Sequence, residues 1–243
     1  FPMGVLNQQA QSVLDEIRQD PRVAYAQPNF IYYNQSASEN FFMEPFYGHQ
    51  WGIYNTGQSV AKTETNPDGY TGIAGIDTKA LEAWQFATGG GVVVAVGDNG
   101  VLAHSDLGNN LLTDDKNPQN LTHNSYGTYY GHGTHVVGII AAQLNEVGLA
   151  GIAPNAKILP YNLFYEWYTD ASGNSVSYTT TAEVLHYIDY IQEKGASISN
   201  NSWGYNKPWS GSLTEWDRAL YDALKALEDK HLFVVAAGNS SAN

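Results

Sequence analysis

The sequence contains no cysteine, so a disulfide framework and a thiolate site are both excluded. Basic residues are few: 11 Lys and Arg stand against 24 Asp and Glu, which gives a net charge of −13 at pH 7. This charge argues against nucleic acid and anionic membrane surfaces as partners. No apolar run approaches the roughly 20 residues of a membrane span. Phe1-Pro2-Met3 is neither a start nor a signal peptide, so we expect the chain to begin inside a longer gene product.

The amino-terminal part has too few apolar residues to build a core of its own. Residues 8 to about 20 have the one-sided apolar pattern of a helix, and residues 23 to 33 read as an extended strand with aromatics. Residues 34 to 78 hold many Asn, Gly, Ser and Thr, which predicts a long surface segment with little regular structure. We therefore expect this part to pack on something else.

From residue 78 onward, apolar strands alternate with helices. The predicted strands cover residues 92–96, 156–163, 196–200 and 232–237, and the helices cover 78–86, the stretch after His132, 181–193 and 213–230. Between residues 163 and 181 we expect a loop rich in Tyr, Ser and Gly. Continuous apolar strands alternating with helices predict an α/β fold, a parallel sheet with helices on both faces.

Ligands and catalytic groups of such sheets lie beyond the carboxyl ends of the strands. Asp98 follows the first strand, Asn200 ends the third, and Asn239 follows the fourth, while His132 opens a helix between Gly131 and Gly133. A carboxylate can orient an imidazole, and an amide N–H can stabilise an oxyanion. The pattern therefore predicts a catalytic edge at which a nucleophile is still missing.

Five ordered segments resemble the subtilisin-like serine proteases, the subtilases. Residues 94–100 resemble the strand and turn that carry the family's catalytic Asp, and residues 132–138 are close to its histidine motif. Residues 151–156 follow at the family's usual distance. Residues 199–204 resemble the strand edge that pairs with substrate, and residues 234–239 resemble the segment ending in the oxyanion-hole Asn. The order Asp before His is that of subtilisin.

The resemblance implies a serine endopeptidase. Asp98 would orient His132, His132 would act as general base and acid, and Asn239 would stabilise the tetrahedral oxyanion. Three residues, Ser202, Trp203 and Gly204, would pair with the substrate backbone as an added strand.

This sequence departs from the family pattern at two places. Asn99 stands where the family has Thr or Ser, and the family's Gly-Thr-Ser-Met-Ala motif lies downstream of the residues present. Loss of a triad nucleophile lowers kcat about a million-fold, a value measured on a subtilisin. We therefore expect this chain alone to be inactive, and the serine to lie beyond it.

The resemblance also divides the chain. Residues 11–33 resemble the last helix and strand of a subtilase prodomain, which assists folding and inhibits the mature enzyme. We predict the end of a prodomain over residues 1–35, a processing region over 36–48, and the first part of the catalytic domain over 49–243. Cleavage would fall between about residues 34 and 44. The implied partners are protein substrates, the prodomain and the missing part of the catalytic domain, and the implied setting is secretion by a bacterium.

Calcium is the cofactor that the resemblance implies. In the family, a loop that interrupts the helix after the histidine holds the ion, and residues 143–149 occupy that position. The matching ligands are Asp106, the Asn145 side chain and three carbonyl groups, those of Gln143, Val147 and Leu149; Gln50 is a further candidate. A set of oxygen ligands suits calcium.

Two other functions remain open from the sequence. A pseudoprotease could keep the fold as a binding or scaffold module without the serine, although such a module has no need of Asp98, His132 and Asn239 together. Alternatively, His132 and His135 are three residues apart on a helix and could bind zinc in a metallohydrolase. No third ligand at a metal-site spacing supports the zinc interpretation.

Overall fold

The computed structural model describes residues 8–26, 40–60, 62, 64–113, 131–173, 175–204 and 218–239. The chain divides into two compact units, Phe1–Asn34 and Gln35–Asn243. In the first unit, α1 (Gln8–Gln19) confirms the helix predicted from residue 8. Residues 23–26 form no strand, so the predicted strand is wrong there, and its remainder at 27–33 lies outside the described residues. The backbone turns at this point, where Arg18 Nε donates to the carbonyl of Ala26 at 2.9 Å.

The second unit is built on a four-stranded parallel sheet of order β4-β3-β7-β8. Its strands are β3 (Val93–Asp98), β4 (Lys157–Asn162), β7 (Ile198–Asn201) and β8 (Leu232–Val235). All four fall on the predicted strands, within two residues at each end. The parallel α/β fold class is confirmed, and all four carboxyl ends share one edge of the sheet.

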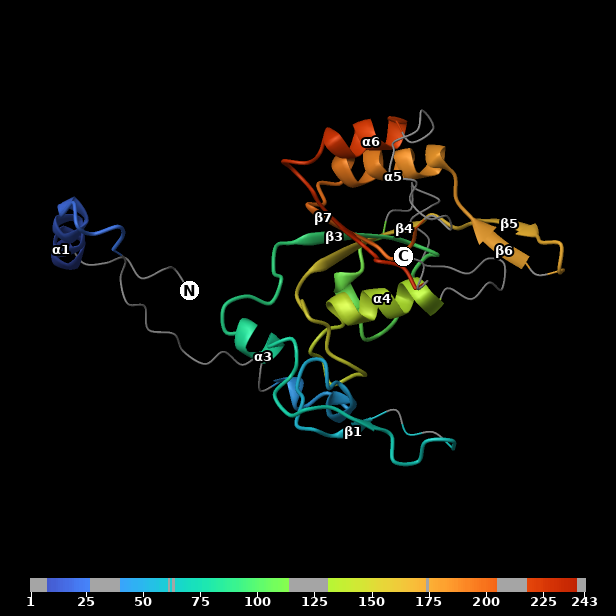
Figure 1. The fold of residues 1–243 in the computed structure, drawn as a ribbon, viewed down its shortest axis with the longest axis horizontal. Helices are drawn as coiled ribbons and strands as arrows, with labels where there is room; N and C mark the ends of the chain where they lie inside the picture. Colours follow the sequence, from blue (N-terminus) through green and yellow to red (C-terminus); the bar gives the residue numbers. More distant parts are fainter. Residues whose placement is uncertain are drawn as a thin grey trace. The chain divides into compact units, whose positions relative to one another are not determined.

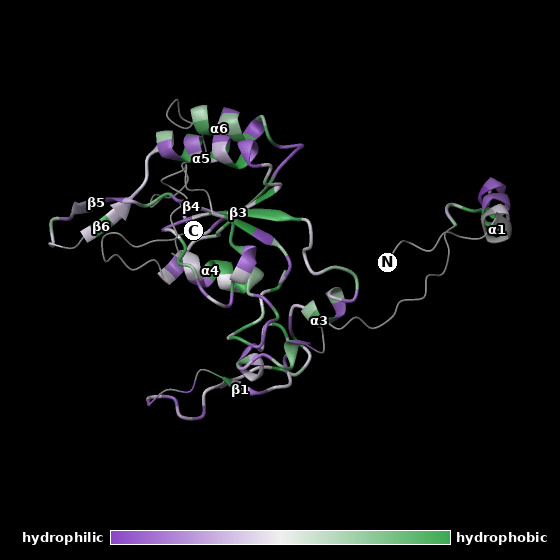
Figure 2. Ribbon diagram, turned by 180° about the vertical axis from the view of Figure 1, so that it is seen from behind, coloured by the Kyte–Doolittle hydropathy of each residue, from purple (hydrophilic) through white to green (hydrophobic). Residues whose placement is uncertain are grey.

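Helices cover both faces of this sheet (Figure 1). α4 (Gly131–Ala141) lies on one face, and α5 (Thr181–Glu193) and α6 (Arg218–Lys225) lie on the other. Each interface is apolar because alternate strand residues point to opposite faces: Val94 and Val96 pack with α4, whereas Ala95 packs with α5. Figure 2 shows β3 as one of the most hydrophobic stretches of this unit. Among the described helices, none is long and apolar enough to cross a membrane.

The stretch predicted as a surface segment carries little regular structure. It contains η1 (Tyr47–His49) and a small antiparallel pair, β1 (Ser59–Val60) with β2 (Tyr70–Thr71). α3 (Ala80–Ala83) follows, and η2 (Gly108–Asn110) comes after β3. A third apolar cluster, with Phe41 and Trp84 fully buried, joins this segment to the main body.

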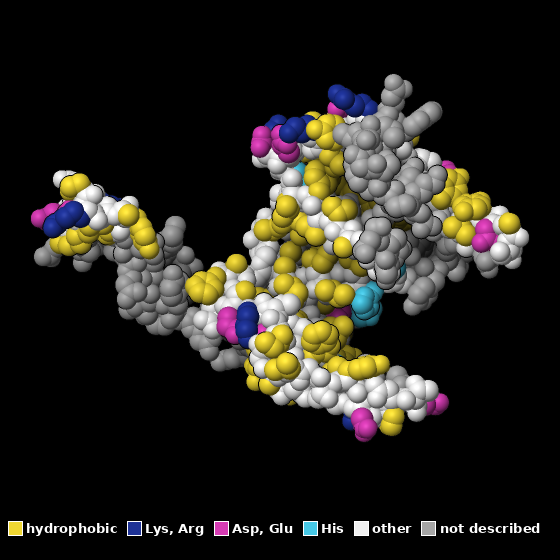
Figure 3. Space-filling model, in the orientation of Figure 1, with side chains coloured by type: hydrophobic (Ala, Val, Ile, Leu, Met, Phe, Trp, Pro, Cys, Tyr) yellow, Lys and Arg dark blue, Asp and Glu magenta, His cyan; other side chains and the backbone are white. Residues whose placement is uncertain are grey.

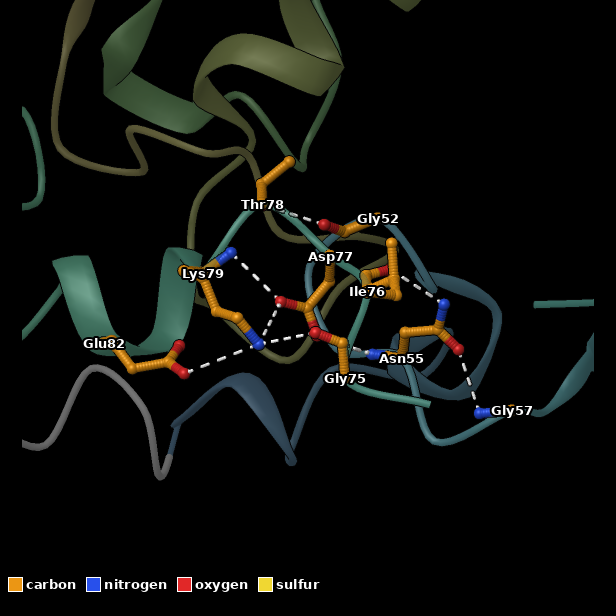
Figure 4. Close-up of polar contacts among 9 residues, drawn as sticks. All are labelled: Gly52, Asn55, Gly57, Gly75, Ile76, Asp77, Thr78, Lys79 and Glu82. Atoms are coloured by element: carbon orange, nitrogen blue, oxygen red, sulfur yellow. Dashed lines mark hydrogen bonds and ion pairs between the residues drawn. The ribbon is translucent and has the colours of Figure 1, made fainter. Parts of the chain in front are cut away.

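Polar contacts fold this segment back on itself (Figure 4). The carboxylate of Asp77 accepts from the backbone N–H of Asn55 at 3.1 Å and pairs with the ammonium of Lys79 at 3.2 Å. Lys79 also donates to the carbonyl of Gly75, and Asn55 donates to that of Ile76. The N–H of Asn55 is the first cause of a lowered pKa at Asp77. A buried asparagine and an ionised aspartate therefore hold the turn before α3.

A hairpin occupies the stretch predicted as a loop. β5 (Glu166–Thr169) pairs with β6 (Ser175–Tyr178) in antiparallel register. Its base is tied to α5, because the hydroxyls of Tyr161 and Tyr165 donate to the two oxygens of buried Glu183, at 2.7 and 3.0 Å. Local sequence could not reveal this, since the anchoring carboxylate belongs to the next helix.

Candidate active site

The imidazole of His132 lies against the carboxylate of Asp98. Nδ1 of His132 is 2.8 Å from Oδ1 and 3.0 Å from Oδ2 of Asp98. The Asp98 side chain, the last on β3, is 4% exposed, whereas that of His132, in the first turn of α4, is 60% exposed. A buried carboxylate thus holds one ring nitrogen and leaves the rest of the ring open to solvent, as proton transfer requires.

Close backbone approach makes this contact possible. A β-carbon on Gly133 would clash with the carbonyl oxygen of Gly100 and come within 3.1 Å of Cβ of Asp98. The hydroxyl of Thr134 accepts from the N–H of Leu102 at 3.0 Å. The first turn of α4 therefore packs directly onto the segment that follows β3, which places the ring beside the carboxylate.

A tyrosine lies behind the same strand end. A β-carbon on Gly97 would come within 2.9 Å of the Tyr187 ring and of Leu163 Cδ1. Tyr187, on α5, is fully buried, and this burial raises its pKa, so it stays neutral. Leu163 donates its N–H to the carbonyl of Asp98 at 2.8 Å. The strand end is thus clamped between α5 and the residue that follows β4.

The predicted substrate-pairing residues follow β7 at the same edge. The amide of Asn200 donates to the hydroxyl of Ser202 at 2.9 Å. Trp203 meets Phe164 edge to face, with ring centroids 6.4 Å apart, and Gly204 is exposed. The indole N–H of Trp203 is buried and has no hydrogen-bond partner in the part of the chain that the structure describes. These three residues therefore lie beside the strand that carries Asp98.

Asn239 lies four residues beyond β8, after Gly238, whose φ is +88°. β8 pairs with β7, and β7 pairs with β3, so the chain leaves β8 at the edge where Asp98 ends β3. Asn239 is exposed. The sheet order thus brings the segment that leads to Asn239 out at the edge where Asp98 and His132 are in direct contact.

A family model described as the subtilase family (Peptidase S8) matches residues 89–243. The chain belongs to the subtilase family. It is 34% identical to fervidolysin of Fervidobacterium pennivorans over 169 residues, 67% of this chain and 22% of that protein. It is also 34% identical to thermitase of Thermoactinomyces vulgaris over 173 residues, 68% of this chain and 53% of that protein.

Among solved structures, a complex of Aeromonas sobria serine protease with the chaperone ORF2 matches with a TM-score of 0.62 and 28% identity. That match covers 83% of this chain and 33% of the other. The subtilase chain thus spans about half or less of the relatives it matches.

The residues predicted to hold calcium in this subtilase also come together. Oδ2 of Asp106 accepts from the N–H of Leu149 at 3.0 Å, and the N–H of Gln143 donates to the carbonyl of Asp106 at 2.8 Å. The Asn145 side chain accepts from the N–H of Val147 at 3.0 Å and donates to the carbonyl of Ser105. The loop 143–149 therefore closes around Asp106.

Gln50, the further calcium candidate, is held by two hydrogen bonds. Its side chain donates to the carbonyl of Ala150 at 2.7 Å and accepts from the N–H of Ala150 at 2.9 Å. In this arrangement Gln50 fastens the start of the predicted mature domain to the end of the loop, and its amide oxygen already has a donor.

Glu44 is a residue of this cluster that sequence reasoning missed. It is 1% exposed, and its Oε1 accepts from the N–H of Glu146 at 3.0 Å, while its Oε2 has no hydrogen-bond partner among the described residues. Within the same described part of the chain, Oδ1 of Asp106 is also buried without a hydrogen-bond partner. Burial is the first cause of a raised pKa at both carboxyls, and the charge of Asp106 raises that of Glu44 further. Two buried carboxylates with unused oxygens fit a divalent cation.

The zinc interpretation gains no support. Nδ1 of His132 is directed at Asp98, and His135 is exposed. Across the part of the chain that the structure describes, no group of three or more His, Cys, Asp or Glu side chains is placed to hold a metal. The predicted calcium ligands do not form such a group, because amide and carbonyl oxygens make up most of the set.

Proposed function

We propose that this subtilase chain is part of a serine endopeptidase that hydrolyses peptide bonds through an Asp, His and Ser triad. The contact between Asp98 and His132 carries the proposal. A buried carboxylate at Nδ1 fixes the tautomer in which Nε2 can accept a proton, and it stabilises the imidazolium that forms. His132 takes the proton of the attacking serine and then gives it to the leaving amine. Asn239 donates an N–H to the oxyanion, and Ser202, Trp203 and Gly204 align the substrate.

We place the serine in a segment of the protein beyond residue 243, and the uncovered half of the sheet supports this. On the α4 face, Val94 is 7% exposed, whereas Leu232, two strands away in the same row, is 58% exposed. In the next row Val96 is fully buried and Val234 is 46% exposed. Figure 3 shows hydrophobic side chains gathered over the central sheet. Bare apolar strand residues beside α4 call for another element to cover them.

The test is labelling of the full-length protein with a fluorophosphonate, which reacts with activated serines. We expect the wild-type protein to be labelled and to cleave casein, and Asp98→Asn and His132→Ala to lose most of both activities. A folded full-length protein that takes no label would instead support the pseudoprotease. Activity that persists after serine-directed inhibition and disappears with a zinc chelator would support the metallohydrolase.

The same proposal includes a structural calcium ion. Asp106, the Asn145 side chain and the carbonyls of Gln143, Val147 and Leu149 would hold it, with Glu44 as a second carboxylate. The ion would neutralise two buried negative charges and stiffen the loop after α4. Its role is stability, since its ligands are not the residues assigned to proton transfer.

The proposed partners are protein substrates, the missing part of the catalytic domain and the protein's own prodomain. We assign residues 1–35 to the end of the prodomain, 36–48 to the processing region and 49–243 to the catalytic domain, and we propose a secreted bacterial enzyme. The compact unit Phe1–Asn34 supports the first boundary within one residue.

A further inference from the structure

Three consecutive residues of α4 are tied to the segment that follows β3. His132 contacts Asp98, the N–H of Gly133 donates to Oδ1 of Asn99 at 3.0 Å, and the Thr134 hydroxyl accepts from Leu102. The first and third ties belong to features already described. The middle tie uses the residue at which this sequence departs from the family, since Asn99 stands where Thr or Ser is usual.

We propose that Asn99 is a positioning residue, one that sets the orientation of the catalytic pair through both of its polar ends. This proposal rests on the function proposed above. The backbone N–H of Asn99 donates to Oδ1 of Asp98 at 2.8 Å, the same oxygen that His132 approaches. The side chain of Asn99 holds the helix that carries the imidazole. One residue therefore connects to both partners of the contact.

The side-chain bond is a helix cap supplied by a distant segment. Gly133 is the third residue of α4, and the first four N–H groups of a helix lack partners inside it. Asn is among the best acceptors for these groups, although it normally precedes its own helix. Here the cap comes from 34 positions earlier in the chain. It thus fixes where the helix begins relative to β3, in addition to satisfying a donor.

The packing leaves little room for an alternative arrangement. A β-carbon on Gly133 would lie 3.2 Å from Oδ1 of Asn99, so the helix approaches this side chain as closely as a glycine permits. Asn99 is itself half-buried and forms an isolated bridge with Asn162, the last residue of β4. The backbone of Asn99 is therefore held by β4, while its side-chain oxygen accepts from α4. Thr or Ser at this position has a shorter side chain, so we infer that neither would reach the N–H in the same way.

The test uses the full-length protein. Asn99→Ala keeps the backbone donor to Asp98 and removes only the cap, so we expect kcat to fall roughly tenfold or more with KM nearly unchanged, because small displacements of a catalytic group are costly. The downfield proton resonance of the His132 Nδ1–H, seen by NMR, should broaden or disappear. Asn99→Asp retains an acceptor oxygen and should restore the resonance and most of kcat.

The matched control is Asn155→Ala. It removes a side-chain hydrogen bond of similar length, 2.7 Å from the Asn155 amide to the Thr88 hydroxyl, between residues that precede β4 and β3. It should leave kcat and the resonance unchanged. The proposal is overturned if Asn99→Ala keeps wild-type kcat and resonance, or if Asn99→Asp is impaired as much as Asn99→Ala. A wild-type protein that has no peptidase activity, but whose resonance responds as expected, refutes the proposed function and leaves the positioning role standing.

Discussion

Outside the catalytic pair, two buried carboxyl oxygens have no hydrogen-bond partner in the described ranges of the chain. Oε2 of Glu44 and Oδ1 of Asp106 are both buried, and the loop 143–149 surrounds them with backbone groups. A raised carboxyl pKa means that the folded state binds protons more tightly than the unfolded state does. Without calcium, folding stability therefore falls as pH rises from about 4 through the raised pKa values.

Glu44→Gln tests this expectation. The amide keeps the shape and an acceptor oxygen but cannot ionise, so the calcium-free variant should be more stable than wild type at pH 7. Calcium affinity should fall at least about tenfold, because the charge of the ligand set controls it. Thermal melts in chelator and in calcium, with isothermal titration of calcium, measure both effects. Glu193→Gln, at an exposed carboxylate on α5, is the control. Equal calcium affinity in Glu44→Gln and wild type would remove Glu44 from the site.

At Gly133, the absence of a β-carbon allows α4 to pack against the segment that carries Asp98. In Gly133→Ala, the added methyl would force α4 away from the carbonyl of Gly100 and from Asp98. Overpacking of this kind typically costs about 1–3 kcal/mol, so we expect a lower melting temperature and a larger loss of kcat. Gly90→Ala is the control, because a β-carbon there meets nothing within 4 Å. If both variants melt and turn over alike, the close approach does not control the site.

Among the elements, β8 is a strand most of whose apolar side chains are exposed. Of the strands that the structure describes, only β7 pairs with it, and Val235, its last residue, is 66% exposed. An apolar edge strand is an aggregation hazard in an isolated chain. The hairpin of β5 and β6 is the opposite case, because Glu183 and the two tyrosines anchor its base. Element stability in this fold therefore depends on partners that lie elsewhere in the chain.

Val234→Lys tests whether the exposed face of β8 is covered by another segment in the full-length protein. If a further segment covers this face in the full-length protein, the charge should lower the free energy of unfolding by roughly 1.5–3 kcal/mol, the value of a buried Val side chain. Ile73→Lys, at a position that is 76% exposed in a loop, should change it by less than about 0.5 kcal/mol. Urea denaturation measures both. Similar small effects at the two positions would mean that nothing covers this face.

At the scale of the whole molecule, the boundary between the two compact units falls between residues 34 and 35 of the chain. The proposed processing site lies between about residues 34 and 44, and Glu44 adds a constraint. A cut after Glu44 would remove a proposed calcium ligand from the mature enzyme. If the mature enzyme keeps this ligand, we expect the cleaved bond to lie before Glu44.

Self-processing is the corresponding prediction. The purified full-length protein should release an amino-terminal fragment, and mass spectrometry should place the cut after residue 33 and before residue 44. His132→Ala should remain uncut, because the cleavage would depend on the protein's own catalytic pair. Addition of active wild-type enzyme to His132→Ala tests for cutting between molecules. A cut within the catalytic domain, or equal processing of the variant, would contradict the assignment.

Much of this arrangement is contained in the sequence itself. Apolar runs predicted all four strands, and a helical pattern predicted α5 with both ends correct, because burial on both faces and helix capping act over short distances. The rule that sites lie at strand carboxyl ends singles out Asp98, and His132 opens a helix at the same edge. Local chemistry determined these features because each depends on neighbours within a few residues.

Only the tertiary structure decided the rest. The β5–β6 hairpin depends on Glu183 of α5, and the cap on α4 depends on Asn99, 34 residues before its partner. Glu44 enters the acidic cluster from 62 positions before Asp106 in the chain, and no local pattern marks it. The exposed apolar residues of β8 result from the position of this strand at the end of the sheet order. These features are set by long-range contacts, several of them between a side chain and the backbone of a distant segment, which local sequence patterns do not specify.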